Sequence, residues 1–340
     1  MAGSVRRVAC LLLATAFVIG SAASASAAPS SWTLETSPNR GNGPNELREI
    51  ACATPSSCMA LGTFLVDNVY ETIGMRWNGR HWQMAPTRNR KDASTNLLSV
   101  ACSGPDSCLA VGWSQSNFRP DTTALVEHWD GAHWSIVPNP PGTKPYLLFG
   151  VACPTTTTCF VVGNRYQSQH DIETPLFERW DDGSLTTVAG SGLQPWVTDL
   201  SCPSATTCVA IGATTINNDE LRVQTFDGAH WTDAGAPTPS TLAGLQSVSC
   251  ASPTYCMTSG WYYNWDRGKW LPLEKDGTTK FSLGLVLTWD GTTWAHQNVP
   301  RSGHFSNSLA AVSCPSTTQC HAVGSWTHDH VPQTSTLGSS

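Results

Sequence analysis

Residues 97–113 read LLSVACSGPDSCLAVGW, and residues 129–134 close the same unit with WDGAHW. Short segments rich in Val, Leu, Ala and Trp, separated by turn residues such as Gly104-Pro105-Asp106, are typical of β-strands. The Asp130-Gly131 pair favours a hairpin, because this type of turn needs positive φ angles. The unit therefore predicts short antiparallel strands joined by tight turns.

The cysteine-containing part of this unit occurs six times along the 340 residues. Twelve of the thirteen cysteines form pairs with five residues between the two members: Cys52 with Cys58, Cys102 with Cys108, Cys153 with Cys159, Cys202 with Cys208, Cys250 with Cys256, and Cys314 with Cys320. The first cysteines of successive pairs are 50, 51, 49, 48 and 64 residues apart. A period near 50 indicates a repeat architecture, and four short strands per repeat are the signature of a β-propeller blade.

We therefore predict an all-β fold, a six-bladed β-propeller with four-stranded antiparallel blades. The predicted repeat units are about 46–87, 97–138, 147–190, 197–235, 245–299 and 309–340. The last unit has no W-D-G-x-x-W segment, whereas Trp32 to Pro38 resembles Trp134 to Pro138. Residues 32–38 are expected to add the fourth strand of the last blade and so remove two aggregation-prone sheet edges. A truncated gene with a spare N-terminal strand is the alternative.

The cysteine pairs admit two interpretations. Structural zinc sites usually separate paired cysteines by two to four residues and need four ligands. Cysteines with five residues between them can face each other across a tight hairpin, at a Cα separation that suits a disulfide. We predict six disulfides that join the first and second strands of each blade, and no metal site or cofactor.

The N-terminus carries an export signal. Arg6 and Arg7 precede an apolar run from Val8 to Gly20, and small residues follow it. This is the pattern of a secretory signal peptide, and we place it at residues 1–27, with the propeller at 28–340. The alternative is a membrane anchor, but the apolar run is about 13 residues, against the roughly 20 needed to span a bilayer. We expect a secreted protein with no membrane insertion after cleavage.

The units look like those of secreted propeller-repeat proteins from actinomycete-type bacteria, which share S-C-P-S-x-x-x-C-x-A-V-G and W-D-G-x-x-W segments. The D-G-x-x-W turn is also similar to the Asp-box hairpin of sialidase-like propellers, S-x-D-x-G-x-x-W, although it lacks the residue between Asp and Gly. This resemblance covers nearly all of residues 32–340 and implies the fold rather than an activity. Sialidase-like catalysis would need an Arg-bearing motif near the N-terminus, which Phe118-Arg119-Pro120 only partly matches.

Composition excludes several partners. The formal net charge of −6 is opposite in sign to what nucleic acid or an anionic membrane attracts. The sequence contains no G-x-S-x-G, H-E-x-x-H, P-loop or dinucleotide motif. His328-Asp329-His330 is compatible with a metal pair, but such residues are also simply solvated on loops.

Individual function is expected where the repeat varies. The cysteine turns and W-D-G turns share one face of a propeller, and His81, His133 and His230 recur there beside Trp, which favours a role in the turn. The opposite face carries the variable loops. The fifth unit is about 14 residues longer than its neighbours, and the excess is rich in aromatic residues.

Clustered surface aromatics suit stacking on sugar rings or binding a protein partner. The predicted ligand-binding residues are Trp261, Tyr262, Tyr263, Trp265, Trp113 and Tyr166. The alternative for the insertion is an extra hairpin, Trp265 to Trp270, that packs on itself. We predict a secreted, non-catalytic binding or scaffold propeller for a glycan or an extracellular protein. The alternative is a carbohydrate-active hydrolase or lyase whose carboxylates, from different blades, meet at the channel mouth.

Overall fold

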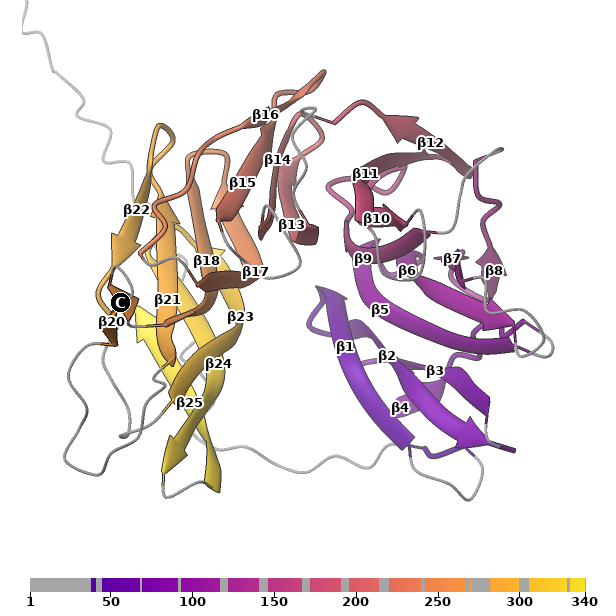
Figure 1. Ribbon diagram of the computed structural model, residues 1–340. Coiled ribbons are helices and arrows are strands. Elements are labelled where there is room, and N and C mark those ends of the chain that lie inside the picture. The colour runs from indigo at the N-terminus through magenta and orange to yellow at the C-terminus, as the bar shows by residue number, and fades with distance from the viewer. Residues whose placement is uncertain are drawn as a thin grey trace, which may run out of the picture. The chain divides into compact units, whose positions relative to one another are not determined.

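The computed structural model describes residues 38–40, 45–67, 69–90, 93–116, 122–140, 146–166, 172–190, 196–213, 220–239, 242–263, 265–266, 269–270, 282–299, 306–328 and 331–339. Within these ranges every regular element is a β-strand (Figure 1). The predicted signal peptide and residues 32–37 of the predicted closing strand lie outside them.

The first three sheets each hold four antiparallel strands that pair in chain order. The first contains β1 (Asn45–Thr54), β2 (Ser57–Val66), β3 (Val69–Trp77) and β4 (Trp82–Met84). The second contains β5 (Ala93–Gly104), β6 (Ser107–Ser116), β7 (Thr122–Trp129) and β8 (Trp134–Ile136). The third contains β9 (Tyr146–Ala152), β10 (Thr158–Tyr166), β11 (Ile172–Asp181) and β12 (Ser184–Val188).

Two more four-stranded sheets follow, and then a three-stranded one. The fourth contains β13 (Trp196–Ser204), β14 (Thr207–Ala213), β15 (Leu221–Phe226) and β16 (Trp231–Asp233). The fifth contains β17 (Ala243–Ser252), β18 (Tyr255–Tyr263), β21 (Ser282–Trp289) and β22 (Trp294–Gln297), with the small separate pair β19 (Trp265–Asp266) and β20 (Lys269–Trp270) between β18 and β21. The last contains β23 (Ser306–Ser316), β24 (Gln319–His328) and β25 (Val331–Ser339).

All six predicted disulfides are present, and each joins the first and second strands of its sheet. The bridges run from Cys52 to Cys58, from Cys102 to Cys108, from Cys153 to Cys159, from Cys202 to Cys208, from Cys250 to Cys256 and from Cys314 to Cys320. The Cα atoms within each pair are 3.9–4.1 Å apart. The disulfide interpretation of the cysteine pairs is therefore confirmed.

The ladders explain why five intervening residues suit these bridges. Cys102 and Cys108 are direct partners between β5 and β6, and Cys250 and Cys256 are direct partners between β17 and β18. Cys52 and Cys58 pair in the same way between β1 and β2. In these three hairpins the bridge therefore joins residues that the backbone already places face to face.

The hairpin between the third and fourth strands is built by one carboxylate and one glycine. Asp130 Oδ1 accepts hydrogen bonds from the backbone N–H groups of Ala132 (2.8 Å) and His133 (2.7 Å). Gly131 has a φ of 97°, a conformation that side chains with a Cβ rarely adopt. The same arrangement recurs at Asp227-Gly228 and Asp290-Gly291, which explains why the Asp-Gly pair repeats.

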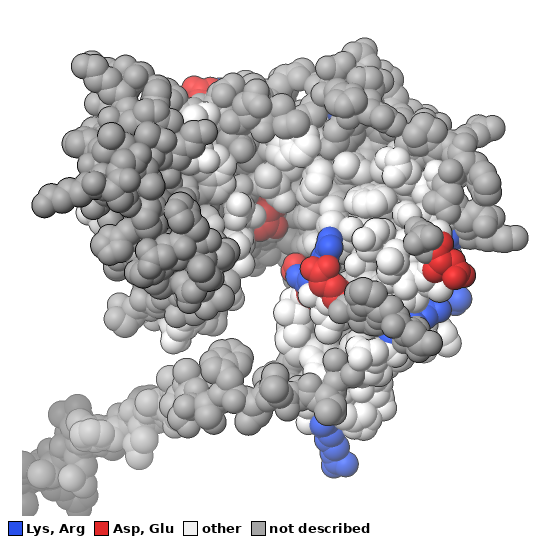
Figure 2. Space-filling view, turned by 60° about the horizontal axis from the view of Figure 1, so that its bottom comes forward, with Lys and Arg blue, Asp and Glu red and all other residues white. Residues whose placement is uncertain are grey.

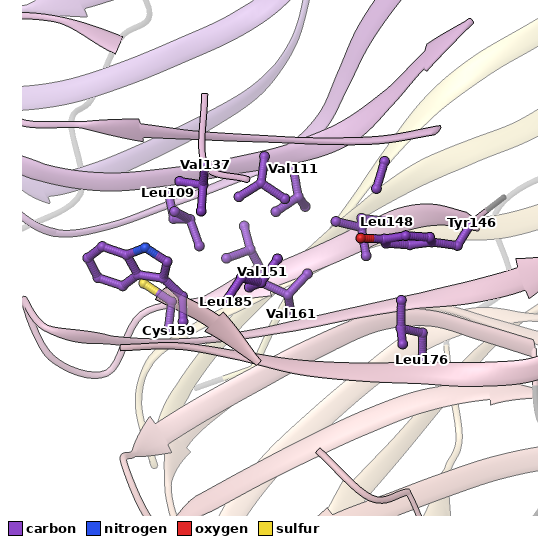
Figure 3. Close-up of a cluster of buried hydrophobic side chains, with 13 residues drawn as sticks. Leu109, Val111, Val137, Tyr146, Leu148, Val151, Cys159, Val161, Leu176 and Leu185 are labelled. Carbon is purple, nitrogen blue, oxygen red and sulfur yellow. The ribbon is translucent and has the colours of Figure 1, made fainter. Parts of the chain in front are cut away.

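Five clusters of the hydrophobic core lie between consecutive sheets, and we call these junctions seams. A sixth, smaller cluster of Phe64, Ile73 and Met75 lies within the first sheet. One cluster joins the second sheet to the third: Leu109 and Val111 of β6 pack with Leu148 and Val151 of β9 (Figure 3). Equivalent clusters join the first sheet to the second, the third to the fourth, the fourth to the fifth and the fifth to the last. The core therefore sits between the sheets, as face-to-face sheet packing requires.

Hydrogen bonds add to the later seams. Asp199 Oδ2 accepts the N–H of Val248 at 3.0 Å, and Ser247 Oγ accepts the N–H of Val312 at 3.3 Å. The Ser201 and Ser249 hydroxyls likewise accept the N–H groups of the first cysteines of the next sheets, at 3.0 and 2.9 Å. A further link comes from Asn164, whose amide bonds to both the N–H and the C=O of Val197.

Two seams also bury a glutamate at the same repeat position. Glu127 is 0% exposed, and its Oε2 accepts the N–H of Arg88 at 2.9 Å. Glu178 is 1% exposed, and neither carboxylate oxygen has a hydrogen-bond partner among the described residues. The residue of the preceding sheet that corresponds to Arg88 is Pro140, which has no N–H to donate. Burial raises the pKa of Glu178 to about 7, although the Arg165 guanidinium opposes the rise.

The raised pKa of Glu178 predicts that the protein is more stable in mild acid than at neutral pH. Below the ordinary pKa of 4.5 the carboxyl is protonated in both the folded and unfolded states. Between pH 4.5 and about 7 the carboxyl is protonated in the folded state and ionised in the unfolded state, so unfolding releases a proton. The unfolding free energy therefore decreases as the pH rises through this range. The loss is on the order of 3 kcal/mol for this group. We expect the Tm to fall across this pH range.

Glu178→Gln should flatten that pH dependence, since the amide does not titrate. Glu46→Gln, a change at an exposed glutamate, is the matched control and should leave the profile unchanged. Thermal unfolding followed by circular dichroism between pH 4.5 and 8 measures both. Equal slopes for wild type and Glu178→Gln would contradict the assignment.

Candidate functional site

The structure places three predicted ligand-binding residues together at the end of β18. Trp261, Tyr262 and Tyr263 are all half-buried, and they directly precede the insertion of the fifth unit. The rings of Trp261 and Tyr263 meet edge to face, with their centroids 5.2 Å apart. Because alternate residues of a strand share a face, these two rings lie on one side of the sheet and Tyr262 lies on the other.

Besides the Tyr263 ring, the Trp261 indole lies against the backbone of Gly244. Its direct ladder partners are Gly244 on β17 and Gly284 on β21. A Cβ atom added to Gly244 would lie 3.0 Å from the indole, so glycine is needed there for the ring to approach the strand. Gly244 therefore leaves room for the indole, whereas the space at Gly284 faces the Leu309 and Val299 side chains. A flat aromatic ring at a strand end suits stacking on a ligand.

Tyr262 has a different environment. It packs against the cluster between the fourth and fifth sheets, which includes Ala243 and Leu245. Its ring meets the His296 ring at 90°, with the centroids 5.7 Å apart. Tyr262 therefore packs against its neighbours with one part of its side chain, and the other part is exposed.

Trp113 occupies the corresponding position in the second sheet. It follows Gly112 on β6, as Trp261 follows Gly260 on β18, and it is half-buried. It lies on the same strand face as Leu109 and Val111, which pack against β9. Trp113 and Trp261 therefore both stand at the end of a seam, but they belong to different sheets and do not form one cluster.

The remaining two predicted site residues are described only by their backbone. Tyr166 is the last residue of β10, opposite Ile172 of β11. Trp265 pairs with Trp270 in the small β19–β20 ladder. The extra hairpin that was the alternative for the insertion is thus present as a backbone feature, and the side chains that would decide between binding and packing lie outside the described residues.

Sequence reasoning missed a pair of carboxylates on the first strands. Glu49 of β1 and Asp199 of β13 occupy the same place in the repeat, two residues after the apolar residue that opens L-x-x-[VIL]-[AS]-C. Each follows a β-bulge in its ladder. Burial and, to a smaller extent, the negative charge of Asp199 together raise the pKa of Glu49 to about 7. The signal was available in the alignment, where the other units carry Ser99, Gly150, Ser247 and Ala311.

The Asp199 carboxylate already accepts hydrogen bonds from backbone groups of the same chain. It accepts the N–H groups of Leu200 at 2.8 Å and Val248 at 3.0 Å. Burial raises its pKa to about 6, while these bonds and one from the Ser247 side chain lower it. Asp199 therefore has a clear structural role in the seam between the fourth and fifth sheets.

The recurring histidines belong to the turns, as expected. His133 and His230 each donate a backbone N–H to the turn aspartate, and His81 donates one to Asn78 at the corresponding place. These bonds lower the pKa of Asp130 and Asp227. The His81 ring nitrogen also lies 3.4 Å from the Asn78 amide and 2.8 Å from the Gln83 amide. The feature that all three positions share is the backbone hydrogen bond, so the position selects a backbone conformation.

The rest of the described surface offers few charged sites. Figure 2 shows charged side chains at a few separate places on the displayed face, with uncharged surface between them. No helix among the described residues is long and apolar enough to cross a membrane. Of His328-Asp329-His330, only His328 is described, so the metal interpretation of this segment is untested.

No family model matches the chain, and no curated protein is detectably similar to it. A GH74 enzyme from Niastella koreensis is similar in structure, with a TM-score of 0.51 at 12% identity over 82% of this chain and 44% of the enzyme. This chain thus spans less than half of that enzyme. A protein of unknown function from Dyadobacter fermentans has a TM-score of 0.52 at 11% identity, over 88% of this chain and 96% of its own.

YCF48 from Cyanidioschyzon merolae gives a TM-score of 0.49 at 10% identity, over 84% of this chain and 94% of its own. At identities this low, structural similarity is evidence of fold and not of activity. The antiparallel four-stranded sheets and the structural similarity to the GH74 enzyme show that the chain has an all-β, propeller-type fold.

The turn assignment predicts unequal effects of two neighbouring substitutions. His133→Ala should leave the Tm unchanged, because the turn uses only the backbone N–H of this residue. Asp130→Ala should lower the Tm, because the N–H groups of Ala132 and His133 lose their acceptor. Differential scanning calorimetry of both variants checks this, and a larger loss from His133→Ala would contradict the turn role.

Proposed function

We propose that this protein is a secreted, non-catalytic binding or scaffold propeller whose ligand is a glycan or an extracellular protein. The observation that carries the proposal is the Trp261–Tyr263 pair, half-buried at a strand end and supported by glycine backbone. Aromatic rings held in this way supply contact area at little cost in conformational entropy. A saccharide ring stacks on such a surface through its apolar face.

The location of the pair supports the proposal as well. Trp261 adjoins the insertion, the longest departure from the repeat, and loops on a rigid scaffold commonly carry binding residues. The proposed site also includes Tyr262, Trp265, Trp113 and Tyr166. Secretion is supported by the six disulfides, since such bonds persist in oxidising compartments.

The proposal also covers the number of blades and the strand that completes the last blade. The six described large sheets are taken as six blades of one propeller, with residues 32–38 as the fourth strand of the last. The support is the six-fold cysteine repeat and the three-stranded last sheet, β23 to β25. The signal peptide at residues 1–27 belongs to the same proposal.

Trp261→Ala is predicted to weaken ligand binding about thirtyfold, the effect of losing a stacked aromatic anchor worth about 2 kcal/mol. The Tm should change little, because the ring is only partly buried. An immobilised-glycan array identifies the best glycan, and isothermal calorimetry with that glycan measures the loss.

Trp134→Ala is the matched control. Trp134 is 0% exposed in the cluster between the first and second sheets, so its removal should cost about 3–5 kcal/mol of stability. The folded fraction of this variant should bind normally. If Trp261→Ala binds as tightly as wild type, the aromatic site is wrong.

One observation favours a second candidate function, a carbohydrate-active hydrolase or lyase. Glycosidases use a carboxylic acid with a raised pKa and a second carboxylate from another part of the chain. Glu49 meets the first requirement, and Asp199 of another sheet is close enough to influence it. The hydrogen bonds that Asp199 accepts from the backbone place this candidate second.

Glu49→Gln distinguishes the two functions. If the protein is a hydrolase or lyase, this variant should lose at least a hundredfold of the activity found in a screen of polysaccharides, because a general acid contributes about that much. If the protein only binds, neither form should release reducing sugar or unsaturated product. Glycan affinity should then be the same for both forms, since Glu49 lies on β1 and the aromatic pair lies on β18.

A further inference from the structure

The five described seams follow one rule. The first and fourth residues of the L-x-x-[VIL]-[AS]-C segment pack against the second strand of the preceding sheet. Leu97 and Val100, for example, share a cluster with Met59 and Leu61. The same positions meet in the other four seams, through Leu148 and Val151, Val197 and Leu200, Leu245 and Val248, and Leu309 and Val312.

The first sheet breaks this rule. In the other five sheets these two residues are at most 8% exposed. In the first sheet they are Leu47 and Ile50, which are 43% and 56% exposed. The sequence therefore presents the seam pattern on β1, where these two side chains stay exposed. Ile73 and Met75 of β3 lie on the same face of the sheet, but each is only 1% exposed.

The last sheet carries the opposite half of such a seam. The residue that corresponds to Met59, directly after the second cysteine, is His321, and it is exposed. The residue that corresponds to Ser201 and Ser249 is Ser313, also exposed. In the later seams these serines accept the N–H of the first cysteine in the next sheet. The matching donor for Ser313 is the N–H of Cys52.

We propose that the face of β1 that carries Leu47 and Ile50 docks on the last sheet, β23 to β25, of the same chain. This sixth seam packs Ile50 beside His321, and Ser313 Oγ accepts a hydrogen bond from the N–H of Cys52. The interface is distinct from the fourth strand that residues 32–38 are proposed to add.

The last sheet is the expected partner of β1 because this contact continues the pattern of the five existing seams. Each of the first five sheets uses its second strand to cover the next sheet, and each of the last five is covered by the one before it. Two faces are then left over: the face of β24 that would cover a next sheet, and the face of β1 that would be covered by a preceding one. A second copy of the chain would offer the same face, so the test must separate the two.

Ile50→Asp tests the seam. If Ile50 is buried against the last sheet, the substitution buries an unpaired charge, and the Tm should fall by roughly 6 °C or more. The matched control is Ile136→Asp on β8, where the isoleucine is 39% exposed. Without a sixth seam, the more exposed Ile50 should tolerate aspartate at least as well as Ile136.

Light scattering after gel filtration at two protein concentrations separates the occupants. A monomeric wild type with a much larger Tm loss for Ile50→Asp than for Ile136→Asp supports the intramolecular seam. A dimer that Ile50→Asp converts to monomer would mean that a second copy covers β1, which overturns the proposal. Equal Tm losses for the two variants also overturn it.

Amide hydrogen exchange measured by NMR keeps the test decisive if Ile50→Asp fails to fold. The Cys52 N–H should exchange slowly in wild type and at least tenfold faster in Ser313→Ala. Ser249→Ala is the matched control, because Ser249 Oγ accepts the Cys314 N–H at 2.9 Å. Fast exchange at Cys52 in wild type, alongside a protected Cys314, would overturn the seam.

Discussion

The structure depends on packing between sheets more than on any contact within one. A single three- or four-stranded sheet has little core of its own and must bury its apolar face against another element. Here Leu and Val side chains of the first strand in the second to sixth sheets pack against the second strand of the sheet before it. Each sheet therefore completes the core of its neighbour, and stability accumulates along the chain as in other repeat proteins.

Much of the fold was predictable, because the features that define it are local and repeated. The cysteine spacing located the first two strands of every unit, and Asp130-Gly131 located the hairpin between the last two. Both signals act over fewer than ten residues, so a single sequence reveals them. The hairpin of Trp265 and Trp270 was also visible as a weak copy of the repeat.

The candidate site was less predictable, because its properties arise between strands that are far apart in sequence. The aromatic cluster at Trp261 could be found by composition, but the approach of its indole to Gly244 required the ladder register. The carboxylates of Glu49 and Asp199 were overlooked because no motif joins them. Glu178 was overlooked for a similar reason, since its lack of a donor depends on Pro140 in the preceding sheet.

The placement of the disulfides has consequences for proteolysis of the chain and for its evolution. Every bridge spans six positions and stays within one sheet, so no covalent tie other than the backbone connects one sheet to the next. A protease that cleaves a linker leaves two fragments held together only by noncovalent contacts, namely side-chain packing and hydrogen bonds. For the same reason, a whole unit can be gained or lost by recombination without leaving an orphaned thiol.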